Sequence, residues 1–238
     1  MTRLSVNINK IATLRNARGG NNPDVIKAAM DCERFGAQGI TVHPRPDERH
    51  IRLTDVLQLK DVVTTEFNIE GYPDDRYLKI IQQVRPAQAT LVPDPPEAIT
   101  SNAGWDTVKH TSFLKEVCAE IKSQGVRVSL FVDPQPRMVE GAILAGADRV
   151  ELYTEPYARE FQVKKEISIK PYVESARVAR AGGIGINAGH DLDLHNLKFL
   201  KESIPYLDEV SIGHALVCDA LYFGLENTIQ LYLHQLRD

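Results

Sequence analysis

Three histidines and two glutamates stand at or near the ends of short apolar runs, and both residue types transfer protons near neutral pH. In chain order they are His43, Glu70, Glu151, His190 and His214. One such residue is weak evidence, because a lone histidine is more often a hydrogen-bonded structural residue. Several around one cavity would perturb one another's pKa values, and together they indicate general acid/base chemistry.

Phosphate binding is indicated by two glycine-containing segments that follow the last two apolar runs. These are Asn187-Ala188-Gly189 and Gly213-His214-Ala215, and in many barrels the corresponding turns hold a phosphate on backbone N–H groups. Tight turns alone would also need these glycines. Residues 15–22 are interpreted as a flexible loop in which Arg15 and Arg18 offer guanidinium groups, although a solvated surface loop would look similar.

The elements that must position these residues are short β-branched runs alternating with segments of helical period. The predicted strands are residues 4–8, 39–42, 66–69, 89–92, 127–132, 149–153, 183–186 and 209–212. The predicted helices include residues 24–35, 75–84, 113–123, 136–145, 169–181 and 194–203. This order predicts an α/β fold made of a single (β/α)8 TIM barrel over residues 1–238, whose strand ends meet at one mouth.

An open, doubly wound sheet is the alternative fold. It usually carries a glycine fingerprint after its first strand, and none follows Ile8. The long connection at residues 93–112 is expected to cover the barrel mouth, since loops of that length are more often functional than idle.

Metal and Schiff-base chemistry find little support in the sequence. No histidine pair has the spacing of a His-x-x-x-His or His-Glu-x-x-His motif. No predicted strand has a lysine in its interior, and Lys10 lies just past the first strand. The remaining histidines, His110, His195 and His234, are assigned to the surface, while His50 stays undecided.

The composition excludes several classes of protein. The chain has 238 residues, a net charge of -4 and 43% hydrophobic residues, without a basic tract for nucleic acid or an anionic membrane. The first residues lack the apolar segment of a signal peptide, so a cytoplasmic location is expected. Residues 215–236 are interpreted as an apolar terminal helix that covers the barrel or a neighbouring subunit. The three cysteines, Cys32, Cys118 and Cys218, are expected to be buried thiols.

At this point the motifs resemble a known family. They are Val6-Asn7-Ile8, residues 11–19, residues 39–43, Arg49-His50-Ile51, Asn68-Ile69-Glu70, residues 128–131, Asn187-Ala188-Gly189-His190 and Ile212-Gly213-His214-Ala215. In this order they resemble the pyridoxine 5'-phosphate synthases, the ring-forming enzymes of a bacterial vitamin B6 pathway. The resemblance covers nearly the whole chain.

The resemblance implies a (β/α)8 barrel with additional helices, assembled as a homo-octamer, that uses neither a metal nor an organic cofactor. It also implies the reaction: 3-amino-2-oxopropyl phosphate condenses with 1-deoxy-D-xylulose 5-phosphate to give pyridoxine 5'-phosphate, inorganic phosphate and water. Nearly every step of that sequence moves a proton, which suits a mouth lined with histidine and glutamate.

Motif by motif, the resemblance assigns roles to individual residues. It makes His43 and Glu70 general bases, His190 the general acid and Glu151 a stabiliser of a charged intermediate. The residues implied for the aminoketone phosphate are Asn7, Arg18, Gly213 and His214. Those implied for the deoxyxylulose phosphate are Arg45, His50 and Thr100, the last in the long connection that closes over the substrates.

Two positions depart from the commoner family pattern, and both belong to the substrate-contacting set. Asn9-Lys10 replaces an Asp-His pair, and Asp191 stands where glycine follows the active-site histidine. Lys10 offers a charged donor in place of an imidazole. Asp191 offers a carboxylate that would raise the pKa of His190 and keep it protonated.

Two other hypotheses are weighed against the synthase. A sugar-phosphate epimerase or aldolase on the same fold would share the phosphate turns, but it would need clustered metal ligands or a strand lysine. A catalytically silent barrel serving in assembly would have no chemical reason to keep His43, Glu70 and His190 together.

Overall fold

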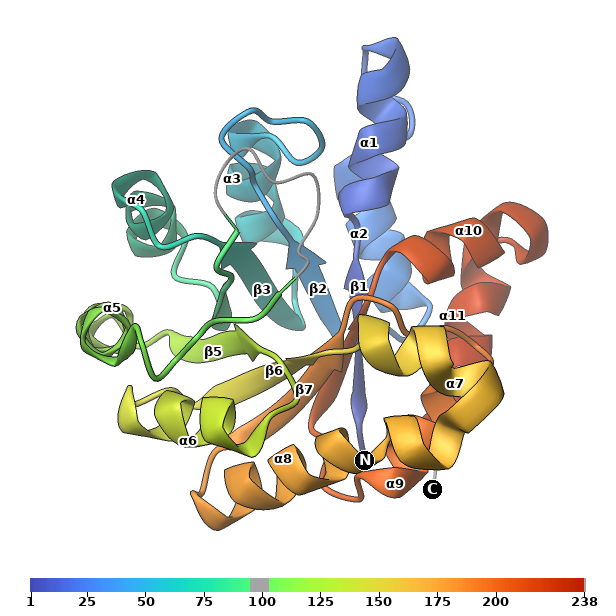
Figure 1. Cartoon of the computed structure of the whole chain (residues 1–238). Coiled ribbons are helices and arrows are strands. Elements are labelled where there is room, and N and C mark those ends of the chain that lie inside the picture. Colours follow the sequence, from blue (N-terminus) through green and yellow to red (C-terminus); the bar gives the residue numbers. More distant parts are fainter. Residues whose placement is uncertain (95–102, 238) are drawn as a thin grey trace.

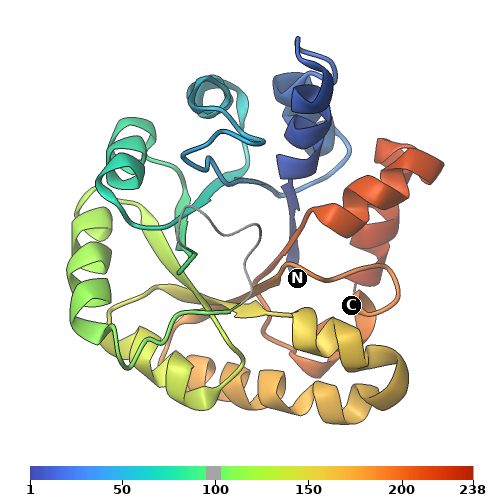
Figure 2. The same cartoon turned by 45° about the horizontal axis from the view of Figure 1, so that its top comes forward.

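Eight parallel strands close into one ring, and helices surround it (Figures 1 and 2). The computed structural model describes residues 1–94 and 103–237. The strands are β1 (Arg3–Asn7), β2 (Gly39–Val42), β3 (Glu66–Gly71), β4 (Gln88–Leu91), β5 (Arg127–Val132), β6 (Arg149–Tyr153), β7 (Gly185–Gly189) and β8 (Glu209–Ile212). Each pairs in parallel with the next, and β1 pairs with β8. The predicted (β/α)8 barrel is confirmed.

Predicted and observed strand bounds agree for β2, β5, β6 and β8, whereas the predicted bounds of β7 were wrong. Gly183 belongs to the turn after the preceding helix, with φ 74°. The strand instead runs to Gly189, which pairs with Tyr153 of β6. Asn187-Ala188-Gly189 is therefore the end of a strand and not a turn that follows one.

The helices around the barrel include several that the sequence reading left unassigned. They are α1 (Asn9–Arg18), α2 (Val25–Arg34), α3 (Leu53–Val62), α4 (Asp75–Val84), α5 (Thr111–Ser123), α6 (Pro136–Leu144), α7 (Glu155–Ser168), α8 (Lys170–Ala181), α9 (Leu197–Ser203), α10 (His214–Phe223) and α11 (Leu225–Gln235). None of the described helices is long and apolar enough to cross a membrane.

The single terminal helix predicted over residues 215–236 is in fact two helices, α10 and α11. Gly224 has φ 77°, a left-handed backbone that ends α10 and turns the chain before α11. The two helices pack against each other, and α11 also lies against α2. Cys218 is exposed on α10, contrary to the expected burial, whereas Cys32 and Cys118 are buried.

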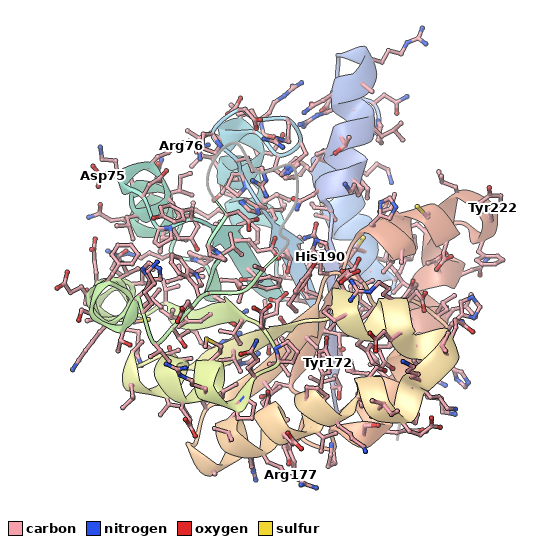
Figure 3. The ribbon with its side chains drawn as sticks, viewed as in Figure 1. Asp75, Arg76, Tyr172, Arg177, His190 and Tyr222 are labelled. Carbon is pink, nitrogen blue, oxygen red and sulfur yellow. The ribbon has the colours of Figure 1, made fainter. Side chains whose placement is uncertain are left out.

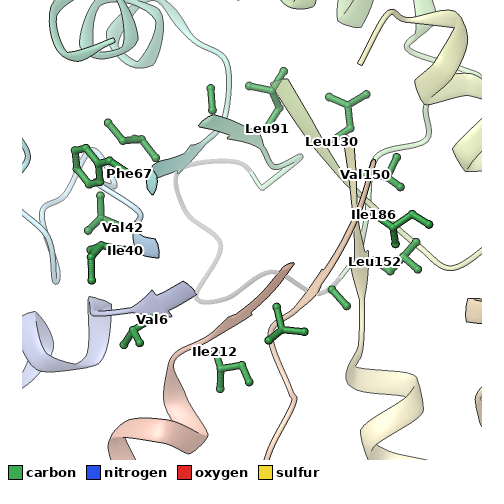
Figure 4. Packing of buried hydrophobic residues seen from close by; sticks show 14 of the residues in the cluster. Val6, Ile40, Val42, Phe67, Leu91, Leu130, Val150, Leu152, Ile186 and Ile212 are labelled. Carbon is green, nitrogen blue, oxygen red and sulfur yellow. The ribbon is translucent and has the colours of Figure 1, made fainter. Parts of the chain in front are cut away.

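Residues alternate between the two faces of each strand, and the outward residues form the main apolar core. Val6, Ile40, Leu91, Val150 and Ile212 are buried, and Figure 4 shows such side chains on the outer side of the ring, toward the helices. Branched side chains packed between strands and helices thus hold the helical layer on the barrel.

The inward residues are polar, which is unusual for a barrel of this type. Ser5 and Thr41 share a hydrogen bond of 2.7 Å between their hydroxyl oxygens. Asn68 donates to Thr41, and Thr90 donates to Asn68. Because these groups are buried, each needs a partner, and the bonds join β1 to β4 across the interior.

Charged side chains fill the amino-terminal end of the barrel. Glu66 forms ion pairs with both Arg3 and Arg127. On the other side Arg149 donates to Asn187 at 3.1 Å and lies 3.9 Å from the carboxylate of Glu209. These contacts tie β1, β3 and β5 together, and β6, β7 and β8, at the end opposite the strand termini that carry the predicted site.

Arg15 lies in helix α1, not in the flexible loop that was predicted. Its side chain is 1% exposed and forms a bidentate pair with Asp55, at 2.6 and 2.8 Å. Asp55 also accepts the backbone N–H of Arg52 and so caps α3. Arg15 and Asn16 both donate to the carbonyl of His50. Arg15 therefore fixes the segment that carries His50 and is not available to a phosphate.

Part of the connection expected to cover the mouth, residues 93–112, lies outside the described residues, and Thr100 is among those left out. The described part packs onto the barrel. Trp105 is buried, its backbone N–H donates to Phe131, and its indole N–H donates to Leu91 at 3.1 Å.

Replacing Arg15 by Met is expected to destabilise the protein, because it leaves the carboxylate of Asp55 buried without its partner. The expected loss of unfolding free energy is about 3–5 kcal/mol, measured by denaturant titration at one fixed protein concentration. Arg18→Met is the matched control on the same helix: Arg18 is exposed, and its replacement is expected to cost less than about 0.5 kcal/mol. Equal losses in the two variants would contradict this account of Arg15.

Candidate active site

The structure brings the principal proton-transfer residues together at the carboxyl-terminal end of the barrel. Asn7 is the last residue of β1, and Glu70 is the residue before the end of β3. The side-chain amide of Asn7 donates a hydrogen bond to the carboxylate of Glu70 at 3.4 Å. His43 follows β2, and its Nδ1 lies 3.7 Å from Oε2 of Glu70. His190 follows β7 and lies at the centre of the view in Figure 3. Four strands thus contribute to one cluster.

His43 is held as a neutral imidazole. Its pKa lies well below the usual value because the ring is buried and because the cations Arg45 and Arg49 and the ring of His50 are close. The contact with Glu70 is accordingly not an ion pair. The backbone N–H of His43 donates to Asn9 at 2.9 Å, so Asn9 positions the start of this segment. A neutral imidazole beside the mouth can accept a proton.

Glu70 is poised to exchange a proton near neutral pH. Burial raises the pKa of its carboxyl group to about 7; the charge of His190 opposes this rise and that of Asp94 adds to it. A carboxyl group with a pKa this close to working pH serves as an efficient base.

Glu151 lies inside the barrel, 3% exposed. Burial, followed by the charges of Glu70 and Glu209, raises the pKa of its carboxyl group well above the usual value and so favours the protonated form. Its Oε2 has no hydrogen-bond partner in the described part of the chain. A Cβ at Gly189 would lie 2.3 Å from the other carboxyl oxygen, so glycine is needed there for Glu151 to fit.

The surroundings of His190 favour the charged form of its ring. Burial lowers the pKa of the ring, but the hydrogen bond to Asp191 and the charges of Asp191, Glu70 and Asp94 outweigh burial and raise it. The cluster therefore contains an imidazole whose pKa is lowered, a carboxyl group whose pKa is raised to about 7 and an imidazole whose pKa is raised. Separation of pKa values by environment is the usual way in which one site holds both acid and base.

Arg45 and His50 form a second group beside the first. Arg45 is buried and pairs with Asp94 at 3.0 Å. Burial and the charges of Arg45, Lys10 and Arg49 lower the pKa of His50 to about 4. Its Nδ1 accepts the backbone N–H of Ile51 at 2.9 Å, so the neutral ring carries its proton on Nε2. His50 can thus donate one hydrogen bond while the neighbouring cations supply charge.

The other predicted contact residues lie at the rim. Gly213 is buried at the start of α10, and His214, the first residue of α10, is exposed. Gly213, the N-cap of α10, has no side chain to cap the helix, so the first N–H groups of α10 lack a side-chain cap from it. Lys10 is exposed in the first turn of α1. Arg18 ends α1, which projects away from the ring (Figure 1), so the structure does not bring Arg18 into the cluster.

Asp94 and Thr154 are residues of the site to which the sequence reading gave no role. Asp94 follows β4, pairs with Arg45 and raises the pKa of Glu70. In the sequence, the position of Asp94 directly after a predicted strand was the signal that could have identified it as a residue of the site. Thr154 follows β6, and its hydroxyl is 2.6 Å from the carbonyl of Gly189. In residues 1–94 and 103–237, no three histidine, cysteine or acidic side chains are grouped so that they could hold a metal ion.

Fold and cluster together define a class of protein: an enzyme on a (β/α)8 barrel that moves protons at the carboxyl ends of its strands. Solved structures with the same fold include tryptophan synthase from M. tuberculosis, with a TM-score of 0.65 and 13% identity over 99% of this chain and 94% of that chain. Phosphoribosylanthranilate isomerase from Thermotoga maritima matches with a TM-score of 0.61 and 13% identity, over 99% of this chain and 98% of that chain. At these identities the likeness concerns the fold alone.

The particular family follows from sequence similarity. The chain belongs to the family described as pyridoxal phosphate biosynthesis protein PdxJ, whose model matches residues 4–238. A pyridoxine 5'-phosphate synthase from Cytophaga hutchinsonii is 68% identical over 237 residues, with 100% of both chains covered. Synthases of the same name from Christiangramia forsetii and Phocaeicola vulgatus are each 61% identical, again with 100% of both chains covered.

Replacing Glu70 by Gln is expected to stabilise the folded protein at alkaline pH. The pKa of this carboxyl group rises from 4.5 to about 7 on folding, so the folded state holds the proton more tightly and ionisation costs stability as pH rises through that window. At pH 8 ionisation of Glu70 lowers the unfolding free energy by its full amount, on the order of 3 kcal/mol. At pH 5 only a small part of this loss is present.

The measurement is the difference in unfolding free energy between Glu70→Gln and the unmodified protein at pH 5 and pH 8. Glu140→Gln, on the exposed face of α6, is the control and is expected to give the same small difference at both values. A Glu70→Gln difference that does not grow with pH would refute the assignment of a raised pKa to Glu70.

Proposed function

We propose that the chain is a pyridoxine 5'-phosphate synthase. It condenses 3-amino-2-oxopropyl phosphate with 1-deoxy-D-xylulose 5-phosphate to give pyridoxine 5'-phosphate, inorganic phosphate and water. The observation that carries the proposal is the cluster of His43, Glu70 and His190, in which Nδ1 of His43 lies 3.7 Å from Glu70 and the pKa of each group is shifted differently by its surroundings. Whole-length similarity to synthases, at 68% identity for one of them, supports the same reaction.

The reaction requires an imine, elimination of phosphate, addition and loss of water, and an aldol-type ring closure. Each step moves a proton, and the cluster supplies groups of both kinds. Neutral His43 and ionised Glu70 remove protons, and the imidazolium of His190 returns them to leaving oxygen atoms. Glu151, neutral and with a free carboxyl oxygen, donates a hydrogen bond to oxygen atoms that gain negative charge.

Substrate binding divides between the two sides of the mouth. Asn7, Gly213 and His214 hold the aminoketone phosphate, with the first N–H groups of α10 facing the anion; Arg18 is assigned to this phosphate as well. Lys10, Arg45 and His50 hold the deoxyxylulose phosphate. Their charges and the Nε2–H of His50 suit a phosphate or hydroxyl group, and the electrostatic influence of Lys10 and Arg45 on His50 supports their grouping. Thr100 keeps its predicted role on this side.

Assembly as a homo-octamer in the cytoplasm completes the proposal. An apolar surface at the junction of α10 and α11 supports self-association, because Tyr222 is 87% exposed and Leu221 and Phe223 beside it are also exposed. Figure 3 shows Tyr222 at the outer edge of the molecule. Exposed apolar patches of this kind mark surfaces that other chains cover. Light scattering of the purified protein measures the mass of the assembly.

The test of the activity is to mix the purified protein with both substrates and to assay pyridoxine 5'-phosphate and inorganic phosphate. Both products are expected to form at equal rates, and neither is expected when one substrate is left out. Absence of product with both substrates present would overturn the proposal.

Replacing Glu70 by Gln is expected to lower kcat by about 10²- to 10⁴-fold, the contribution of one general base, while substrate binding stays largely intact. In the unmodified enzyme kcat is expected to rise with pH through about 7, as the carboxyl group of Glu70 ionises. Steady-state kinetics over pH 5–9 and calorimetric binding measure these effects. Wild-type turnover in the variant would remove Glu70 from the catalytic role.

Replacing Lys10 by Ala is expected to raise KM for the deoxyxylulose phosphate about tenfold, the loss of one charge-assisted hydrogen bond. KM for the aminoketone phosphate is expected to change much less. Lys60→Ala, an exposed lysine on α3, serves as the control. Equal weakening of both substrates would contradict the assignment of Lys10 to one side of the mouth.

A further inference from the structure

The backbone at His190 is strained. Its φ is 93°, a left-handed value that a residue with a side chain rarely adopts. Such a conformation persists only where the surrounding structure imposes it, and it is found most often at functional sites. The contacts that impose it are therefore part of how the site works.

Thr154 holds the chain on both sides of His190. Its hydroxyl donates to the carbonyl of Gly189 at 2.6 Å, and it accepts the backbone N–H of Asp191 at 3.1 Å. One buried hydroxyl thus bridges the residue before His190 and the residue after it. The amide of Asn196 donates to the carbonyl of Asp191 at 3.2 Å and fixes the following peptide. These bonds close a tight loop from which the imidazole of His190 projects.

Asp191 holds the imidazole itself. Oδ2 of Asp191 lies 2.5 Å from Nδ1 of His190. The edge of the ring also meets the ring of Tyr153, with 5.6 Å between centroids and an interplanar angle of 76°. The contact with Asp191 therefore fixes both Nδ1 and the plane of the ring.

The acidic groups that face His190 come from several elements. Asp191 is its neighbour after β7, Glu70 lies on β3 and Asp94 follows β4, and all three favour the charged ring. Burial opposes them. Two residues of β6 also lie nearby: the ring of Tyr153 contacts the ring of His190, and the carboxyl group of Glu151 lies against Gly189, the residue before His190. Of these groups, Asp191 alone contributes a hydrogen bond to the ring as well as charge.

We propose that Asp191 is a positioning residue for His190. Its place in the family pattern implied a contact with substrate; in this proposal Asp191 does not itself bind substrate. Asp191 orients the imidazole through Nδ1, and Thr154 fixes the backbone that carries both residues. The inference rests on the proposed role of His190 as the general acid. Carboxylates that orient functional imidazoles in this way occur widely in enzymes.

The experiment compares Asp191→Asn with Glu155→Gln, which removes one charge from the start of α7, where Glu155 pairs with Arg159. In Asp191→Asn, kcat is expected to fall about tenfold to hundredfold, with KM for both substrates unchanged. The high-pH limb of the kcat profile is expected to move to lower pH, because the ring loses its proton more readily without the carboxylate. Glu155→Gln is expected to leave kcat, KM and the profile as they are.

Nitrogen NMR of histidine-labelled protein gives a second readout that needs no turnover. The resonances of His190, assigned with His190→Gln, are expected to titrate at lower pH in Asp191→Asn than in the unmodified protein. An unchanged titration would overturn the proposal, and so would a raised KM for one substrate with kcat retained, since that pattern belongs to a substrate contact. If the unmodified protein makes no product, the proposed function fails while the titration still decides the role of Asp191.

The role of Thr154 is tested by two variants, one that keeps the hydroxyl group and one that removes it. Thr154→Ser keeps both bonds and is expected to keep kcat. Thr154→Val loses both and is expected to lower kcat without raising KM. If Thr154→Val fails to fold, the Thr154→Ser kinetics and the His190 titration in Asp191→Asn carry the test. A Thr154→Val variant with normal kcat would show that the hydroxyl does not hold His190.

Discussion

Burial of carboxyl groups at the mouth of the barrel is the constraint on which the rest of the site depends. A carboxyl group removed from water resists ionisation, so its protonation depends on the few charges that reach it. Burial raises the pKa of Glu70 to about 7, and the positive charge of His190 opposes the rise. Asp191 first, and then Glu70 and Asp94, raise the pKa of His190 against burial. Glu151 has no cation among the groups that set its pKa, which is raised well above the usual value.

The fold, and the grouping of His43, Glu70 and His190 at the mouth of the barrel, were largely predictable, because both follow from local pattern. Alternation of apolar runs with helical segments predicted the barrel, since each run forms a strand and each strand buries its outer face. In a parallel barrel all strands end at the same mouth. Reading the residues after each run therefore located His43, Glu70 and His190 before any contact was known.

Other features depend on partners distant in sequence, and no local pattern shows them. Arg15 sits in a polar segment, and only its pairing with Asp55, 40 residues away, buries it. The end of β7 is set by pairing with β6. The roles of Asp94 and Thr154 likewise arise from contacts with Arg45 and with the chain around His190. Protonation states belong with these features, because each depends on every charge nearby.

Pairing of β1 with β8 has a consequence for the order in which the chain acquires its structure during synthesis. The register joins Arg3 to Glu209 and Val6 to Ile212. This edge of β1 therefore cannot pair with β8 until nearly the whole chain has been translated. Until then both outer strands are open edges, which other chains can pair with. The polar interior adds to this exposure, because Ser5 and its partners are shielded from water only once the ring closes.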